Sequence, residues 1–463
     1  MAQASAESGS FRDRRGRIHY LDDRVLRTVM PVAVEDYEYV RSTGFVDRLI
    51  ESGQLVAETK VDRSLLGNGG AAASLVLEHP RLPYISYPYE WSFSALKAAA
   101  LLHLDIQLAA LECDIALTDA SAYNVQFIGP KPVFIDSLSF RRYTDGEFWA
   151  GHRQFCEQFV NPLLLRAVAG VPHNAWFRGS LEGITADELS KLLPWRSRLS
   201  WNILTNVIMQ AKLQRSASSD AAARNVQSRR LPKIGFEQML RSLRGWIARL
   251  TPRDDTNTVW QDYAADNSYS DPEAARKRQF IAAFVSAVSP GVLLDLGCNT
   301  GDYSLLALED GADLAVGFDF DQGALELAYS RARDQSLNFL PLFLDAANPS
   351  PNQGWQQAER QGLSARARGD AVLALALVHH MAIARNLPLD QVVGWITAMA
   401  PAGVIEFVPK ADAMVQRLLS LREDLFDDYE QATFERLLQE HASIVRSEKV
   451  SDSGRMLYWF ERP

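Results

Sequence analysis

Three short apolar runs in the second half of the chain each end in an aspartate, and this repetition constrains the fold more than any other feature. Helical patterns separate the runs, and buried strands that alternate with helices form parallel sheets whose strands end at one edge. The sequence therefore predicts an α/β domain with carboxylates gathered at one sheet edge. The runs and their aspartates are 291–294 with Asp295, 314–318 with Asp319, and 338–344 with Asp345.

A glycine-rich turn, 295–301, follows the first run and precedes a helical pattern. Small residues let the backbone approach a ligand closely, and the amides at a helix start favour a carboxylate or phosphate. A dinucleotide fingerprint needs a second glycine where Asn299 stands, which disfavours NAD. Asp319 is placed to accept hydrogen bonds from both hydroxyls of a ribose. Asp345 can accept from an exocyclic adenine amine, while the amide of Ala346 serves a ring nitrogen.

In their order and spacing these motifs resemble the cofactor site of class I S-adenosylmethionine-dependent methyltransferases, over residues 258–463. The resemblance implies S-adenosyl-L-methionine as cofactor and a Rossmann-like seven-stranded sheet closed by a hairpin at 444–460. It also implies that Asp295 and the glycine turn meet the methionine part, Asp319 the ribose and Asp345 the adenine, with Tyr269 closing over the methionine end. The implied cofactor residues are Tyr269, Asp295, Gly297, Asn299, Gly301, Asp319, Asp345 and Ala346.

After the fourth apolar run the chain continues as Leu377-Val378-His379-His380-Met381. Methylases of planar amides and exocyclic base amines usually carry an Asn/Asp-Pro-Pro-Tyr-like segment there, so nucleic-acid bases and protein amides are disfavoured as acceptors. His379 and His380 are candidates for a general base, because imidazole titrates near working pH. Holding the loop by hydrogen bonds is the alternative for both. Glu406, at the end of the fifth run, is a further candidate for a catalytic or a structural role.

The first half contains Asp119 and Asn124 in a D-x4-N spacing, followed twelve positions later by Asp136. This arrangement resembles the catalytic loop and metal-binding aspartate of protein-kinase-like phosphotransferases. The resemblance implies that Asp119 is the base and that Asn124 and Asp136 bind magnesium. Leu117 stands where that family has histidine, and Lys60 is only a nominal phosphate-pairing lysine. A degenerate kinase-like domain is therefore favoured over an active kinase.

The length of 463 residues fits two or three domains. A polar stretch begins at 214, and an amphipathic helix is predicted over 236–250. We expect an α+β domain at 1–213 that recognises the acceptor, a linker with a bridging helix at 214–257, and the methyltransferase-like domain at 258–463.

The composition of the chain limits the kinds of binding partner and the cellular location that we expect. The formal net charge of −9 is the wrong sign for a chain that coats nucleic acid. Three separated cysteines and the absence of metal-ligand spacing predict reduced thiols, a cytoplasmic location and no metal site. The first twenty residues lack an apolar secretion segment, and the longest strongly apolar run, 371–378, is shorter than the ~18 to 20 residues of a membrane span. We expect no membrane partner, and the oligomeric state is left open.

The whole pattern is similar to a group of two-part bacterial methyltransferases, some of them labelled as nodulation-associated. We therefore expect an enzyme that transfers a methyl group from S-adenosylmethionine to an oxygen or nitrogen of a small or medium-sized acceptor. One alternative is a cofactor-binding scaffold without turnover. Another is a bifunctional enzyme that also transfers phosphoryl groups.

Overall fold

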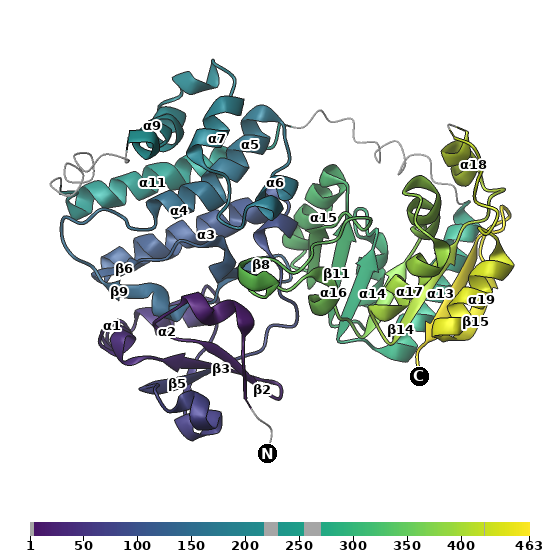
Figure 1. Ribbon diagram of the computed structural model, residues 1–463, viewed down its shortest axis with the longest axis horizontal. Helices are drawn as coiled ribbons and strands as arrows, with labels where there is room; N and C mark the ends of the chain where they lie inside the picture. Colours follow the sequence, from purple (N-terminus) through teal and green to yellow (C-terminus); the bar gives the residue numbers. More distant parts are fainter. Residues whose placement is uncertain (1–3, 217–229, 254–269, 421) are drawn as a thin grey trace. The chain divides into compact units, whose positions relative to one another are not determined.

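The computed structural model describes residues 4–216, 230–253, 270–420 and 422–463 of the chain (Figure 1). The chain divides into two compact units. Unit 1 comprises Met1–Asp255 and Asn352–Arg360, and unit 2 comprises Thr256–Pro351 and Gln361–Pro463. The first change of unit, after Asp255, lies close to the boundary expected at 257. The transfer of 352–360 to unit 1 was not predicted.

Unit 1 begins with a five-stranded antiparallel sheet in the order β1-β2-β3-β5-β4. Two helices connect β3 to β4, and Tyr37 of the first packs with Val29, Leu77 and Leu138 in a buried cluster. Pro31 suits the first turn of that helix because its missing N–H has no partner there anyway. The elements are β1 (Ser5–Ala6), β2 (Ile18–Leu21), β3 (Arg24–Val29), α1 (Pro31–Ser42), α2 (Phe45–Glu51), β4 (Thr59–Val61) and β5 (Leu75–His79).

The long helix α3 (Phe93–Glu112) forms the centre of unit 1. The hydroxyl of Ser92 accepts a hydrogen bond from the amide of Ala95 and so caps the helix start. By length and composition α3 could cross a membrane, but 67% of its most apolar window is buried inside the protein. The sequence pattern predicts a long, mostly buried helix over 93–111, which the structure confirms, and polar residues such as His103 and Gln107 interrupt its apolar run. Both are fully buried.

Two short antiparallel pairs follow, β6 (Ile115–Leu117) with β9 (Phe140–Arg142) and β7 (Val125–Ile128) with β8 (Lys131–Phe134). The rest of unit 1 is helical. Its main helices are α4 (His152–Phe155), α5 (Asn161–Ala169), α6 (Asn174–Gly179), α7 (Ala186–Leu192), α8 (Trp201–Ile203), α9 (Met209–Ser216) and α11 (Lys233–Arg249).

Helix α11 contains the predicted bridging helix, but it packs as part of unit 1. The ammonium group of Lys97 on α3 donates to the carbonyl of Leu250, at 2.9 Å. Arg244 of α11 forms an ion pair with Asp105 of α3. The expectation of a linker over 214–257 therefore does not describe α11, and residues 217–229 and 254–257 of that range lie outside the described part.

The segment 352–360 lies in the chain between β12 (Phe339–Phe343) and β13 (Ala371–Ala374) of unit 2, yet it belongs to unit 1. The guanidinium of Arg12 donates to both carboxylate oxygens of Glu359, at 2.6 and 2.9 Å. The amide of Gln353 donates to the carbonyl of Arg178 at 2.6 Å. Arg360 lies 4.4 Å from the ring centroid of Tyr123. These contacts hold the segment to unit 1 at several points.

Unit 2 contains a seven-stranded sheet in the order β12-β11-β10-β13-β14-β16-β15, in which β16 pairs antiparallel with both of its neighbours and the other pairs are parallel. This confirms the predicted α/β fold class and the seven-stranded sheet. The strands are β10 (Val292–Leu296), β11 (Leu314–Asp319), β12 (Phe339–Phe343), β13 (Ala371–Ala374), β14 (Ala402–Phe407), β15 (Ser443–Lys449) and β16 (Met456–Glu461). The helices are α13 (Asp271–Val288), α14 (Asp302–Glu309), α15 (Gln322–Asp334), α16 (Leu363–Arg366), α17 (Leu389–Ala398), α18 (Ala413–Leu419) and α19 (Gln431–His441).

The central strands of unit 2 are buried along nearly their whole length, as continuous apolar runs in a helix-covered parallel sheet should be. Helix α13 presents Phe280, Ile281 and Phe284 to Leu293 of β10 and Leu373 of β13. This packing fixes the strands whose carboxyl ends carry the predicted site.

Candidate functional site

Strands β10, β11 and β12 are parallel neighbours, so their carboxyl ends lie at one edge of the sheet. Asp295 pairs in register with Gly317 of β11, and Asp319 with Phe343 of β12. Asp345 follows two positions after the end of β12. The structure therefore gathers at one edge the three strand-end carboxylates that the sequence predicted.

The glycine turn after β10 depends on left-handed backbone conformations. The φ angles of Gly297, Asn299 and Gly301 are 81°, 50° and 90°, a region that glycine enters freely and asparagine tolerates. A Cβ on Gly301 would lie 2.5 Å from the Phe339 ring, whereas the nearest atom to a Cβ on Gly297 is a Leu377 methyl at 3.9 Å. Gly301 is thus required by packing, and Gly297 leaves its backbone accessible to a ligand.

Asp319 both holds this turn and keeps capacity for a ligand. One carboxylate oxygen accepts from the amide of Asn299 at 2.7 Å, and the other from the amide of Asp321 at 2.8 Å. The backbone amide of Phe320 also acts on this carboxylate. Because each carboxylate oxygen has two acceptor positions, the side chain still keeps acceptor capacity for a ribose hydroxyl. Burial raises the pKa of Asp319. Asp321 caps α15, accepting hydrogen bonds from the amides of Gly323 and Ala324.

The other two strand-end aspartates differ in their surroundings. Asp295 is 2% exposed and accepts from the hydroxyl of Ser304 at 2.6 Å, which ties β10 to α14. Burial raises the pKa of Asp295 to about 6. Asp345 is more open and accepts from the amide of Ala347 at 3.2 Å, with Ala346 between them. Tyr269, the remaining predicted cofactor residue, lies outside the described residues.

Both predicted catalytic histidines follow β13, and their ring centroids are 4.2 Å apart. His379 is 1% exposed, and its Nδ1 atom is buried without a hydrogen-bond partner. Burial lowers the pKa of His379 well below its usual value and that of His380 to about 4. Both imidazoles are therefore neutral at neutral pH, and a neutral imidazole is able to receive a proton.

Glu406, the third predicted catalytic residue, is fully buried within a charged cluster. The ammonium group of Lys277 donates to one of its oxygens at 2.6 Å, and a guanidinium nitrogen of Arg455 lies 3.8 Å from the other. Arg455 also forms a two-pronged pair with Asp412, at 2.8 and 3.0 Å. Lys277 lies 4.9 Å from the ring centroid of Tyr303. The carboxylate of Glu406 is thus neutralised by cations, an arrangement that favours the structural role.

The sequence reasoning missed Lys277, although the sequence carries a signal for it. Lys277, Phe280, Ile281 and Phe284 follow one another at helical spacing on the buried stripe of α13. A lysine on such a stripe is almost never fully buried unless it is paired. The position therefore called for a buried acidic partner, which is Glu406.

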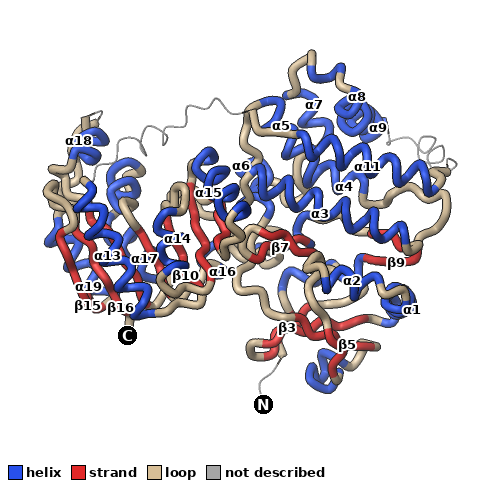
Figure 2. The backbone as a smooth tube through the Cα atoms, turned by 180° about the vertical axis from the view of Figure 1, so that it is seen from behind, coloured by secondary structure: helices blue, strands red, loops and turns tan. Residues whose placement is uncertain are grey.

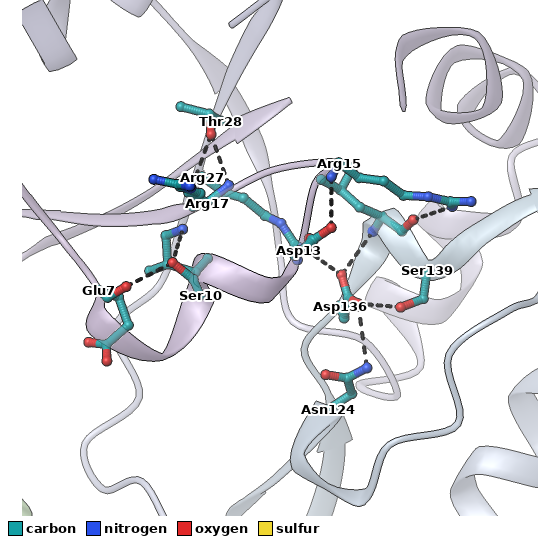
Figure 3. A network of polar contacts seen from close by, with 12 residues as sticks. Glu7, Ser10, Asp13, Arg15, Arg17, Arg27, Thr28, Asn124, Asp136 and Ser139 are labelled. Carbon is teal, nitrogen blue, oxygen red and sulfur yellow. Dashed lines mark hydrogen bonds and ion pairs between the residues drawn. The ribbon is translucent and has the colours of Figure 1, made fainter. Parts of the chain in front are cut away.

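In unit 1 the structure brings together the three residues of the kinase-like pattern. The side-chain amide of Asn124 donates to Asp136 at 3.4 Å (Figure 3). Asp119, in the loop between β6 and β7, accepts from the amide of Ser121 at 2.9 Å. Burial and the nearby charge of Asp136 raise the pKa of Asp119.

The cation beside Asp136 is Arg27 of β3, which the sequence reasoning also missed. A guanidinium nitrogen of Arg27 lies 2.5 Å from Asp136 and 2.9 Å from Asp13, and the hydroxyl of Ser139 donates to Asp136 (Figure 3). Lys60, the nominal phosphate-pairing lysine, is exposed near the Tyr37 ring. The sequence carried one signal for this ion pair, because Arg27 lies within the largely apolar stretch 25–29, where a buried arginine needs an acidic partner.

In the described part of the chain, no group of three or more His, Cys, Asp or Glu side chains is arranged to hold a metal ion. Cys298, inside the glycine turn, is buried, and burial raises the pKa of its thiol well above the usual value. Its side chain packs rather than reacts.

The sheet order and the acidic edge define unit 2 as a Rossmann-like α/β domain with the topology that the methyltransferase resemblance predicted. The chain belongs to the family of nodulation protein NoeA. It is 48% identical over 457 residues to NoeA of Rhizobium meliloti (strain 1021), which covers 98% of this chain and 96% of that protein. No family model matches the chain.

Solved structures of methyltransferases resemble less than half of the chain. The N-methyltransferase NodS from Bradyrhizobium japonicum WM9 is 12% identical, covering 42% of this chain and 98% of its own, with a TM-score of 0.31. The magnesium protoporphyrin IX methyltransferase ChlM from Synechocystis PCC 6803, solved with bound SAH, is 17% identical, covering 44% of this chain and 93% of its own, with a TM-score of 0.32.

Proposed function

We propose that unit 2 binds S-adenosyl-L-methionine at the edge formed by β10, β11 and β12 and transfers its methyl group to an oxygen or nitrogen of a small or medium-sized acceptor. The observation that carries the proposal is the site around Asp319. Its carboxylate keeps acceptor capacity beyond the backbone amides that it binds, next to a turn where Gly297 leaves the backbone open. These features suit a ribose and an anionic methionine end.

The bound cofactor would supply an electrophilic methyl group on a sulfonium. The residues of unit 2 would then position the two reactants and exclude water, which can suffice for an in-line displacement. His380 is the better placed of the two histidines to receive the acceptor's proton, because it is less buried than His379. Its pKa of about 4 makes it a weak base, which suits a hydroxyl or amine whose proton becomes acidic as the methyl group is added.

Calorimetry with S-adenosylhomocysteine tests the cofactor site. Asp319→Ala should weaken binding by about 1 to 3 kcal/mol, because the ribose hydroxyls lose their acceptor. Asp334→Ala, at the exposed end of α15, is the matched control and should bind normally. Equal affinity in the two variants would refute the assignment of Asp319.

A second measurement separates an enzyme from a cofactor-binding scaffold. The full chain is incubated with S-adenosylmethionine and a metabolite extract, and release of S-adenosylhomocysteine is followed. We expect release above that of the Asp319→Ala variant. Tight cofactor binding with no release in any fraction would instead support the scaffold.

For unit 1 we propose a degenerate kinase-like domain that holds the acceptor. The meeting of Asp119, Asn124 and Asp136 between two short strand pairs supports the kinase-like fold. The ion pair of Asp136 with Arg27 argues against a magnesium ion at that carboxylate, because the arginine already supplies the opposing charge. We expect no magnesium-dependent binding of ATP by the full chain. Binding that is abolished by Asp136→Ala would establish the bifunctional alternative.

A further inference from the structure

One stretch of unit 1 has a local excess of basic residues. Residues 189–212 include four basic residues and no acidic one, in a chain whose net charge is −9. The basic residues are Lys191, which forms an ion pair with Asp187 at 2.6 Å, and Arg196, Arg198 and Lys212. A local excess of positive charge in a chain with a negative net charge indicates an anionic partner.

The same stretch exposes large apolar side chains. Trp195, Leu199 and Trp201 are 68%, 78% and 73% exposed, and Leu192 is 45% exposed. Single exposed apolar residues are common, but several within ten positions form a patch of the kind that marks an interaction site. The Trp195 surface is defined here as Leu192, Trp195, Leu199 and Trp201 with Lys191, Arg196 and Arg198.

Local hydrogen bonds give a compact form to the short segment that joins α7 to α8 (Figure 2) and carries most of the Trp195 surface. Backbone bonds from Ser197 to Pro194, from Leu199 to Arg196 and from Ser200 to Ser197 fold the segment back on itself. The Arg198 side chain donates to the carbonyls of Ser190 and Leu193. The exposed rings are therefore presented by a defined backbone.

The guanidinium of Arg196 lies 5.3 Å from the ring centroid of Trp195, so an indole and a cation are neighbours on this surface. Indole rings favour the boundary between water and lipid, because one end is apolar and the other donates a hydrogen bond. Leucine side chains can enter the acyl region, and arginine can pair with phosphate. This combination fits the headgroup region of an anionic membrane.

We propose that the Trp195 surface docks unit 1 on anionic phospholipid headgroups. A symmetric contact with a second copy of the chain is less favourable, because it would bring the basic side chains of both copies together. Nucleic acid would satisfy the arginines but offers no counterpart to the exposed leucine. This proposal departs from the expectation of no membrane partner, which rested on the lack of a spanning segment and did not consider docking on a membrane surface.

Co-sedimentation of the full chain with lipid vesicles tests this proposal. We expect binding to phosphatidylcholine vesicles that contain phosphatidylglycerol and much weaker binding to phosphatidylcholine alone. The Arg196→Gln, Arg198→Gln double variant should bind the anionic vesicles roughly 10- to 30-fold more weakly, from about 1 kcal/mol per basic residue near the surface. The Trp195→Ala, Trp201→Ala double variant should lose binding by a similar or larger factor.

Two controls match these variants. Trp355→Ala removes another exposed tryptophan, which is 64% exposed in the segment 352–360. The double variant Arg241→Gln, Arg249→Gln removes two exposed charges from α11. Both should bind vesicles like the wild type, apart from a small loss from net charge in the second.

Several results would overturn the proposal. They are absence of wild-type binding to anionic vesicles, equal loss in the test and control variants, or a wild-type dimer that dissociates in the Trp195→Ala, Trp201→Ala variant without any vesicle binding. Quenching of tryptophan fluorescence by brominated acyl chains supplies a second readout. It should be present in the wild type and Trp355→Ala, and absent in the Trp195→Ala, Trp201→Ala variant.

Discussion

Replacing Lys277 by methionine removes the cation that contacts Glu406 most closely, while keeping the size and shape of the side chain. At the observed separation of 2.6 Å, the gross attraction is about 6 kcal/mol for an effective dielectric constant near 20. Most of that is offset in the wild type by the cost of burying both charges. Breaking a buried pair from one side nevertheless costs about 3 to 5 kcal/mol, since the remaining charge has lost its partner.

Arg455 lies 3.8 Å from the other oxygen of Glu406 and softens this loss. We therefore expect Lys277→Met to lower the free energy of unfolding of unit 2 by about 3 kcal/mol. Adding Glu406→Gln removes the stranded charge, so the double variant should recover about 2 kcal/mol relative to the sum of the single changes.

Hydrogen exchange of amides in α13 and β14 is a suitable assay, because a chain with two units need not unfold in one step. A loss of about 3 kcal/mol accelerates their exchange by roughly 100-fold. Arg436→Met removes an exposed ion pair with Glu440 and should change exchange by less than about threefold. If Lys277→Met behaves like Arg436→Met, or if the two changes at Lys277 and Glu406 simply add, the buried pair does not hold this part of the fold together.

Three further outcomes follow from the same unit. Because burial raises the pKa of Asp295 from 3.8 to about 6, the folded state binds this proton more tightly than the unfolded state does. The free energy of unfolding of unit 2 should therefore fall by about 3 kcal/mol as the pH rises through that window. In denaturant titrations, Asp295→Asn should remove this decline. Gly317→Ala places a Cβ 2.7 Å from Cys298 Sγ and the Phe339 ring and should destabilise unit 2 by about 1 to 3 kcal/mol in thermal unfolding, whereas Gly179→Ala, with open space around it, should not. His380→Gln should lower the methyl-transfer rate and leave binding of S-adenosylhomocysteine unchanged; equal rates would assign His380 to the loop alone.

The sheet of unit 2 was predictable because each of its parallel strands from β10 to β14 is a separate apolar run bounded by turn residues. The acidic edge was predictable because parallel strands all end on one side. The charged partners of Glu406 were not, since Lys277 and Arg455 reach it from distant parts of the sequence. Likewise, the spacing of Asp119, Asn124 and Asp136 indicated a common site but not the arginine that neutralises it.

The segment 352–360 eluded prediction for a further reason. Sequence patterns divide a chain at one point, whereas this chain changes unit three times, after 255, 351 and 360. Its loop-like composition gave no indication that Glu359 pairs with Arg12, far earlier in the sequence.

The path of the chain also bears on its synthesis. Ribosomes release the amino-terminal half first, yet unit 1 is incomplete until Arg360 emerges, long after Asp255. Until then Arg12 lacks Glu359, and Tyr123 lacks the guanidinium that covers its ring. If the gene were split at residue 255, the first product would lack the segment 352–360, and the second would carry Glu359 without Arg12. No single cut in the chain therefore yields both units complete.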